Sequence, residues 1–355
     1  MKEEGMGKVF FHPSSLIPHP FFPSPWTSPA RALYCARGGL PRDLLPSERL
    51  AENMKPSPFH GLLVVDKPGG MTSRAVVDRA QGWFPRGTRL GHAGTLDPLA
   101  TGLLVLGVGV ATRLLEYVQR MDKTYRAGLL LGARSNTDDA DGLVEPVEVE
   151  QPPDRAALLP CLQGFTGDID QIPPAFSAAK VTGRRSYDLA RQGQSASLAP
   201  RRVRIYSIDL LAFEYPRVEL EVRCGKGTYI RSLARDLGDR LGCGALVEKL
   251  RRVTTGPFTV ETALDLNVPS AIARAHLLSL SMAVAGLPSL ILPLSRIDQL
   301  RHGQNVPLAG MALPTGREDE EGEVAVLDPD GTLAAVGQVD QNQQVLRPVK
   351  VLPGK

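Results

Sequence analysis

The sequence predicts an α+β fold, because strands and helices follow one another in no strict βαβ order. Three segments carry this prediction. Residues 61–66 form a short apolar run, which is typical of a buried strand. Residues 218–224 alternate apolar and charged side chains, as a half-buried strand does. Residues 230–241 repeat Ile and Leu at helical spacing, and Gly242 is placed to end that helix.

The intervening segments follow similar patterns. Residues 73–84 have a weak helical pattern, and residues 111–119 place three apolar side chains on one helical face. Residues 103–110 and 124–132 are predicted strands, the first of them buried. From residue 289 onwards, short strands between Gly and Pro turns predict a small β domain. The strands expected there are residues 324–327, 332–336 and 345–351.

The composition is that of an ordinary globular protein. A chain of 355 residues exceeds the usual size of one domain, so two domains are expected. The net charge of +3 is too small to indicate nucleic acid by itself, so a locally dense basic segment would have to support that function. The four cysteines are far apart and form no C-x-x-C pair, and the six histidines show no metal-ligand spacing. This pattern favours a reducing cytosol, and no apolar run is long enough to span a membrane.

Residues 1–58 differ from the rest of the chain. Eight prolines fall within the first fifty residues, and neither a helical nor a strand period appears. The segment lacks the apolar region of a signal peptide, and Glu3 and Glu4 argue against a transit peptide. We expect it to be disordered, or to be a mis-called extension in front of a true start at Met54. The alternative is an N-terminal tail that binds RNA or a partner.

One stretch, residues 91–102, combines a carboxylate, an imidazole, three glycines and a proline, directly before the predicted buried strand. Its glycines allow close backbone approach or a positive φ, and Pro98 biases Asp97 toward an extended conformation. A rigid loop with one aimed carboxylate is a common way to build an active site. The competing interpretation is that Asp-Pro simply begins a turn.

Two other segments are rich in charge. Residues 138–142 hold three acids and resemble a truncated calcium loop, but the remaining ligands are absent, so a solvated turn is expected. Residues 167–203 are expected to form a mobile basic arm. Between residues 180 and 204 there are seven basic residues against the single acid Asp188. Such a segment either tracks phosphates or forms a solvated basic face.

Several motifs resemble those of the TruB family of tRNA pseudouridine synthases, and they occur in the family's order. They are GLLVVDKPGGMTS (61–73), GHAGTLDPLATGLL (91–104), DKTYRA (122–127), DADG (139–142), QIPPAFSAAK (171–180), GKGTYIRSLARDLG (225–238) and KLRR (249–252). The resemblance implies a catalytic domain over residues 59–288, with a mixed, mainly antiparallel central sheet flanked by helices. It also implies that residues 167–203 are an RNA-gripping arm and that residues 289–355 are a PUA-like RNA-binding domain.

The resemblance implies isomerisation of uridine to pseudouridine in the T-loop of tRNA, at the position conventionally numbered 55. The N1–C1′ bond breaks, the uracil turns, and C5 joins C1′. Uracil leaves as a stabilised anion, so neither a metal nor a redox cofactor is expected. One carboxylate fits this reaction better than glycoside hydrolysis, which usually needs two. Asp97 matches the family's catalytic aspartate and Arg231 the arginine that pairs with it, which lowers a carboxylate pKa by roughly 1–3 units.

The resemblance also implies the residues that hold a flipped-out uridine. Tyr125 and Tyr229 match the two tyrosines of the pocket, and Tyr229 is also expected to take part in proton transfer at C5. Leu250 matches a residue that contacts the base, His92 matches a histidine that contacts the flipped substrate, and Lys67 is expected to shape the pocket floor. Read singly, the tyrosines, His92 and Leu250 fit core packing equally well. The arm residues expected to bind RNA are Lys180, Arg184, Arg185, Arg201 and Arg202.

The expected partner is the T-arm of tRNA, with no membrane, no obligate protein partner, a monomeric state and a cytoplasmic location. Two alternatives stay open. The chain could be an RNA chaperone that folds tRNA without catalysis, or a relative that acts on ribosomal RNA.

Overall fold

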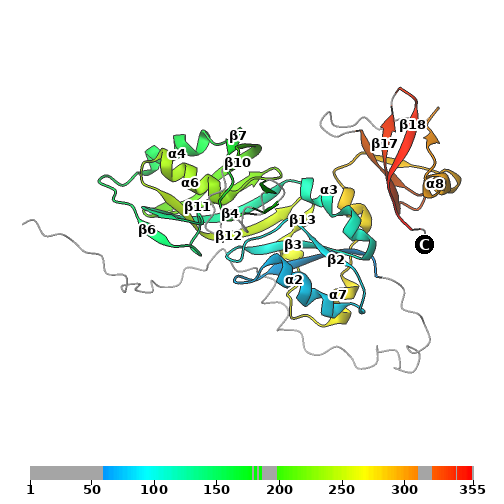
Figure 1. Ribbon diagram of the computed structural model, residues 1–355, viewed down its shortest axis with the longest axis horizontal. Coiled ribbons are helices and arrows are strands. Elements are labelled where there is room, and N and C mark those ends of the chain that lie inside the picture. The colour runs from blue at the N-terminus through cyan, green and yellow to red at the C-terminus, as the bar shows by residue number, and fades with distance from the viewer. Residues whose placement is uncertain are drawn as a thin grey trace, which may run out of the picture. The chain divides into compact units, whose positions relative to one another are not determined.

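The computed structural model describes residues 59–177, 198–310, 322–340 and 342–353, together with the backbone of residues 180–181 and 184–185. The predicted N-terminal extension lies outside these residues, as do most of the arm between residues 178 and 197 and all of residues 311–321. Figure 1 shows the chain as two sheets with helices packed on them.

The larger sheet has nine strands, seven of them in the order β1-β3-β12-β4-β11-β10-β7, with β2 beside β3 and β13 beside β12. All pairs are antiparallel except β3 with β12. The predicted mixed, mainly antiparallel sheet is therefore confirmed. Its strands are β1 (Gly61–Lys67), β2 (Leu90–Ala93), β3 (Thr101–Val108), β4 (Lys123–Leu131), β7 (Gly167–Gln171), β10 (Arg201–Glu214), β11 (Arg217–Cys224), β12 (Ala245–Thr255) and β13 (Phe258–Thr259).

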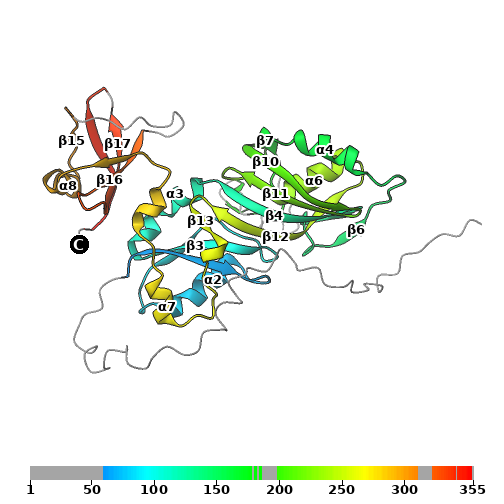
Figure 2. The ribbon, with the colours of Figure 1, turned by 180° about the vertical axis from the view of Figure 1, so that it is seen from behind.

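Two groups of helices cover the larger sheet. In Figure 1, α4 (Arg155–Gln163) and α6 (Ile230–Arg240) lie over β10, β11 and β4. The apolar residues of α6 belong to one core cluster with those strands, so the helical spacing predicted for residues 230–241 is confirmed. Figure 2 shows α2 (Ser73–Ala80) and α7 (Ser270–Ala275) beside β1 and β3, where they pack in a separate cluster.

Three predicted elements differ from the expectation. The buried strand β3 stops at Val108, because Gly109 adopts a φ of +62° and a Cβ there would meet Phe59 and His60. The helix expected over residues 111–119 is two pieces, a 3₁₀ helix (Gly109–Leu114) and α3 (Leu115–Arg120). Similarly, α2 ends at Ala80 and a 3₁₀ turn (Gln81–Trp83) follows it.

The two ends of the predicted arm belong to the sheet. β7 pairs with the start of β10, in register from Arg201 opposite Gln171 to Ile205 opposite Gly167. Between these strands the structure describes one short hairpin, formed by β8 (Lys180–Val181) and β9 (Arg184–Arg185). Outside the sheet, β5 (Ala133–Ser135) and β6 (Val144–Pro146) form a two-stranded ribbon that encloses the acidic turn.

The C-terminal residues form a five-stranded sheet in the order β14-β16-β17-β18-β15, with a core of its own. Helix α8 (Leu294–Arg301) contributes Ile297 and Leu300 to that core. The three strands expected in this region are present. The strands of this sheet are β14 (Ser289–Ile291), β15 (Val306–Pro307), β16 (Glu323–Leu327), β17 (Leu333–Asp340) and β18 (Val345–Val351).

Gly102 is the last residue of the stretch 91–102 and lies where β3 pairs with β12. Its φ is +97°, and a Cβ there would collide with the backbone of Arg252. We expect Gly102→Ala to lower the free energy of unfolding by at least about 1 kcal/mol, because the residue is strained and has no room. Gly82→Ala, where nothing lies within 4 Å, is the matched control and should change it by less than about 0.5 kcal/mol. Equal denaturation midpoints for the two variants would contradict this assignment.

Candidate active site

The loop that carries Asp97 is fixed from several sides. The Ser73 hydroxyl, at the start of α2, accepts a hydrogen bond from Leu96 N at 2.8 Å and donates to Leu96 O at 3.1 Å. Gly70 N donates to Pro98 O at 2.9 Å. Gly94, at the beginning of the loop, has a φ of +83°, a conformation that glycine adopts without strain. Asp97 therefore sits on a rigid support, as its sequence context indicated.

Lys67 holds the same loop through hydrogen bonds to its backbone carbonyls. It is fully buried, and its ammonium donates to Ala100 O at 2.6 Å, to Pro68 O at 2.9 Å and to Pro98 O at 3.3 Å. Burial lowers the pKa of Lys67 to about 8, while the nearby charge of Asp97 opposes that change. The ammonium is thus still mostly charged at neutral pH. Lys67 stabilises the loop through these hydrogen bonds and does not line the cleft described below.

The Asp97 carboxylate forms an ion pair with Arg231, at 2.9 Å between Oδ2 and Nη2. Arg231 lies in the first turn of α6, and its side chain is 6% exposed, whereas that of Asp97 is 37% exposed. The pairing expected from the family resemblance is therefore present in the structure. Because Asp97 remains open to solvent on one side, a substrate can reach the carboxylate while the guanidinium stays covered.

Arg231 also holds the segments around it. Its guanidinium donates to Thr137 O at 2.8 Å and to Phe176 O at 3.0 Å, and it lies 3.3 Å from the Asp139 carboxylate. Asp139 is 4% exposed, so the expectation of a solvated acidic turn is wrong for this residue. The turn folds inward because Asp139 has a buried cation to pair with, and its neighbour Asp138 pairs with Arg235 on the same helix.

These charges act in opposite directions on Asp97. Burial is the largest influence and raises the pKa of Asp97 above its ordinary value; the Arg231 guanidinium opposes the rise and Asp139 adds to it. The arginine thus favours the ionised carboxylate, as expected, but the net pKa shift of Asp97 is upward. A protein without Arg231 would hold this group protonated at higher pH.

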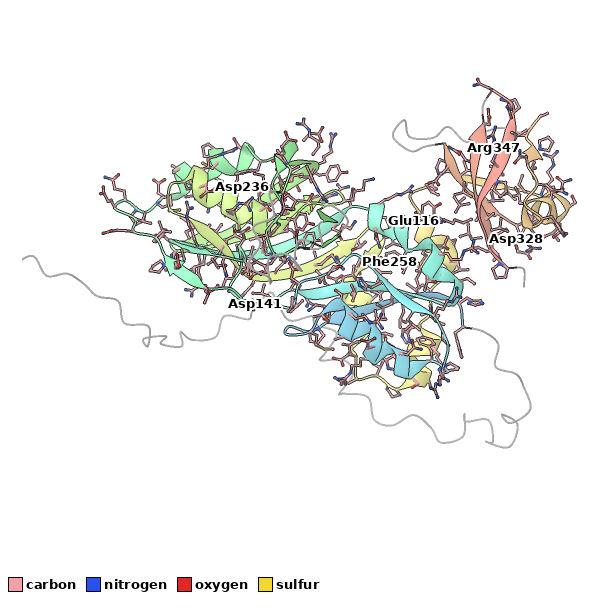
Figure 3. The ribbon with its side chains drawn as sticks, viewed as in Figure 1. Glu116, Asp141, Asp236, Phe258, Asp328 and Arg347 are labelled. Atoms are coloured by element: carbon pink, nitrogen blue, oxygen red, sulfur yellow. The ribbon has the colours of Figure 1, made fainter. Side chains whose placement is uncertain are left out.

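An open cleft of about 540 Å³ contains the carboxylate and the arginine. Tyr125 from β4, Tyr229 at the start of α6 and Leu250 from β12 line it as well. Burial raises the pKa of Tyr125, so its hydroxyl stays protonated at neutral pH. Another part of the lining comes from α3 and includes Glu116, which is labelled in Figure 3. Five of the residues predicted for the site therefore meet in one cleft: Asp97, Tyr125, Tyr229, Arg231 and Leu250.

His92 is not among the residues that line this cleft. It lies on β2, and its Nδ1 is a buried nitrogen without a hydrogen-bond partner in the described part of the chain. Burial lowers the pKa of His92, and Arg252 adds to that effect, so the ring is neutral at neutral pH.

Arg252 belongs to the cleft, although no sequence pattern singled it out as a site residue. It is 1% exposed and donates to Leu103 O at 2.8 Å and to Gly94 O at 3.2 Å, which ties β12 to both ends of the Asp97 loop. The register places Arg252 opposite Tyr125 on β4. Arg252 is the last residue of the KLRR motif (249–252), but neither that motif nor periodicity indicates whether the side chain is buried, and the fold shows that it is.

Among the described residues, no group of three or more His, Cys, Asp or Glu side chains could hold a metal ion. Cys161, Cys224 and Cys243 are free thiols. In the part of the chain that the structure covers, no helix is both long and apolar enough to cross a membrane.

The fold and this site define a class of RNA-modifying isomerase, the pseudouridine synthases. Residues 84–230 match the N-terminal domain model of the TruB family pseudouridylate synthases, and residues 231–296 match the tRNA pseudouridylate synthase B C-terminal domain model. The chain belongs to the TruB family, and it is a tRNA pseudouridine synthase.

Curated relatives agree with this assignment over most of the chain. The tRNA pseudouridine synthase B of Syntrophotalea carbinolica is 41% identical over 280 residues, which cover 78% of this chain and 91% of the relative. The enzyme of the same name from Cereibacter sphaeroides is 42% identical over 283 residues, with the same coverage. That of Xanthomonas axonopodis pv. citri is 39% identical over 305 residues, or 84% and 95% of the two chains.

Solved structures share the fold. A chain of a Cbf5-Nop10-Gar1 complex superposes with a TM-score of 0.66 at 26% identity, covering 82% of this chain and 85% of its own. A chain of an H/ACA RNP bound to a substrate RNA containing 2′-deoxyuridine superposes with a TM-score of 0.63 at 24% identity, covering 85% and 93%. The latter likeness concerns the fold alone.

The charges around Asp97 predict how turnover depends on pH. If Asp97 must be ionised, kcat should fall as the pH drops through the raised pKa of Asp97, so the acid limb should lie above pH 3.8, the ordinary value. Asp139→Asn removes a neighbouring negative charge and should move the midpoint to lower pH. Arg231→Gln removes the favourable cation and should move it to higher pH.

The measurement is single-turnover rate against pH for the three proteins, with the fold of each checked at every pH. The midpoint is compared rather than the maximal rate, because it does not depend on how much activity a variant retains. Midpoints that coincide, or that move in the reverse order, would contradict the electrostatic description of the site.

Proposed function

We propose that the chain converts uridine to pseudouridine in the T-loop of tRNA, at the position conventionally numbered 55. The observation that carries the proposal is the Asp97–Arg231 ion pair in a cleft walled by two tyrosines. The names of the curated relatives support a tRNA substrate. That the modified uridine lies in the T-loop is inferred from the close match between residues 91–104 and the family motif.

The reaction rearranges bonds within one nucleotide. The N1–C1′ bond breaks, the uracil turns while it stays in the cleft, C5 bonds to C1′, the C5 proton is lost and N1 gains a proton. Asp97 starts the reaction, either by adding to the ribose or the base or by removing a ribose proton. The balance is redox-neutral and the leaving uracil is a stabilised anion, so we propose that no metal and no redox cofactor takes part.

The cleft residues then have distinct tasks in this proposal. Arg231 keeps the Asp97 carboxylate ionised and aimed at the nucleotide. Tyr125 and Leu250 hold the flipped base by contact with its face, which offsets part of the few kcal/mol that unstacking costs. Tyr229 lines the same cleft as the carboxylate and moves the proton at C5. Lys67 acts indirectly by fixing the carbonyls of the loop. His92 is proposed to contact the flipped substrate, although it is not among the residues that line the cleft.

Basic residues beyond the cleft are proposed to bind the RNA backbone. Arg201 and Arg202 are exposed at the start of β10, although Arg202 lies 3.6 Å from the Asp170 carboxylate of β7. Lys180, Arg184 and Arg185 lie in the short hairpin, where only the backbone is described. A separate cleft of about 430 Å³ is lined by Arg86, Arg89 and Arg113. Among the described residues Arg86 and Arg89 make no ion pair, and so they are available to phosphates.

The chain is also proposed to act as a monomer. The free thiols fit a reducing cytoplasm, which is also where tRNA is modified.

Asp97→Asn tests the catalytic assignment. The amide keeps the size of the side chain but can neither add to carbon nor accept a proton, so pseudouridine formation should fall by at least about a thousandfold. The affinity for tRNA should stay within about threefold, because the residue lies at one point of a long interface. Pseudouridine is quantified in T-arm and full-length tRNA substrates. Activity within tenfold of wild type would remove Asp97 from the mechanism, and a wild-type protein that only binds tRNA would favour the chaperone alternative.

The basic arm is tested by replacing Arg184, Arg185, Arg201 and Arg202 with alanine. RNA binding should weaken, and the slope of log affinity against log salt should flatten by about 0.7–0.9 for each phosphate that the variant no longer neutralises. The rate at saturating RNA should change little, because these side chains do no chemistry. Arg155→Ala on α4, an exposed arginine without an ion pair in the described structure, is the control for a general change in charge. If the quadruple variant keeps the wild-type affinity and salt slope, the arm is a solvated face.

A further inference from the structure

A buried glutamine makes a two-point contact with the backbone of Tyr229. The side-chain oxygen of Gln171 accepts from Tyr229 N at 3.0 Å, and its side-chain nitrogen donates to Tyr229 O at 3.2 Å. The two backbone groups differ, one being a donor and the other an acceptor, so they also fix which way the amide points. Gln171 is 1% exposed, and both hydrogen bonds are partly buried.

The contact occurs where α6 begins. Tyr229 is the residue that caps the helix, and its own side chain makes no capping hydrogen bond. Its carbonyl also accepts the first helical hydrogen bond, from Leu233 N at 3.1 Å. The Tyr229 carbonyl can accept a second hydrogen bond, and the Tyr229 N–H has no partner within the helix. The side chain of Gln171 bonds to both of these groups. A shift of Tyr229 would move Arg231, which follows two residues later and pairs with Asp97.

Gln171 also stands at a junction in the chain. It is the last residue of β7, and the described segment 172–177 leads from it toward the arm. Helix α6 holds that segment at further points. Ser232 donates to Ile172 O at 2.8 Å, Arg235 donates to the same carbonyl at 2.9 Å, and Arg231 donates to Phe176 O at 3.0 Å. Among these interactions, only that of Gln171 reaches the backbone of a residue that lines the cleft.

We propose that Gln171 is a positioning residue for catalysis: its amide fixes the start of α6, and through it the placement of Tyr229 and Arg231 against Asp97. The proposal rests on the proposed function, because it takes Tyr229 and Arg231 to act in the reaction. It adds a residue that touches neither the substrate nor the reacting atoms.

Gln171→Met is the principal test, since it keeps the length and volume of the side chain but removes both hydrogen bonds. Misplacement on the scale of an ångström costs about a hundredfold in rate, so kcat per folded enzyme should fall by roughly 10–100-fold. The dissociation constant for tRNA should stay within about threefold. The acid limb of kcat should also move to higher pH, because a displaced Arg231 stabilises the Asp97 carboxylate less.

Gln171→Glu is the rescue variant. A protonated carboxyl can accept from Tyr229 N and donate to Tyr229 O, whereas an ionised one can only accept. Its kcat relative to wild type should therefore be highest at low pH and fall as the introduced carboxyl ionises. This variant also keeps the test decisive if Gln171→Met fails to fold.

Ser232→Ala is the matched control, because Ser232 is as buried as Gln171 and also makes a hydrogen bond between α6 and the segment after β7. It should lose comparable thermal stability but keep kcat and the acid limb. Hydrogen exchange at the Tyr229 amide gives a readout that needs no activity: exchange should be faster in Gln171→Met and unchanged in Ser232→Ala.

A folded Gln171→Met protein with wild-type kcat, or with wild-type hydrogen exchange at Tyr229, would overturn the inference. Equal losses of kcat in Gln171→Met and Ser232→Ala would also overturn it. Failure of the proposed function looks different, since the wild-type protein itself would then form no pseudouridine.

Discussion

The site depends on one buried guanidinium. Arg231 is nearly inaccessible to water, and it is stable there because two carboxylates and two backbone carbonyls surround it. A buried charge that loses its partner typically costs about 3–5 kcal/mol, so these interactions constrain each other. The Asp97 loop, the turn that carries Asp139 and the segment after β7 come from distant parts of the chain. The arginine holds all three in one arrangement, and it leaves only Asp97 open to the cleft.

The sheet makes this convergence possible. The parallel pairing of β3 with β12 in the larger sheet places Arg251 and Arg252 opposite Thr101 and Gly102, at the end of the Asp97 loop. β12 then runs antiparallel to β4, which brings Tyr125 beside the same loop. Gly102 has no side chain, so the two strands can approach closely at this point. Backbone geometry thus sets the distance between the carboxylate and the surface that is proposed to hold the base.

Much of this arrangement could be predicted from the sequence. The strands and the helix α6 are predicted by apolar periodicity. The pairing of Asp97 with Arg231 is predicted by the resemblance of residues 91–104 and 225–238 to family motifs. Asp139 could not be placed, because an acidic turn is normally solvated and nothing local shows that a distant arginine will draw it inward. The proximity of Asp168 and Asp170 to two arginines of β10 could not be predicted, because the sequence does not show which residues face each other across strands. Gln171 and Arg252 were missed for the same reason, since their partners are backbone groups far away in sequence.

The central claim is that Arg231, Asp97 and Asp139 act as one unit rather than as separate contributors. A double-mutant cycle on kcat tests it most directly, with Arg231→Gln, Asp139→Ala, which removes the atoms that contact Arg231 as well as the charge, and the two combined. If Asp139 acts by holding Arg231 in place, the double variant should lose little more activity than Arg231→Gln alone. Losses that multiply, so that the double variant falls by the product of the two single effects, would contradict the account.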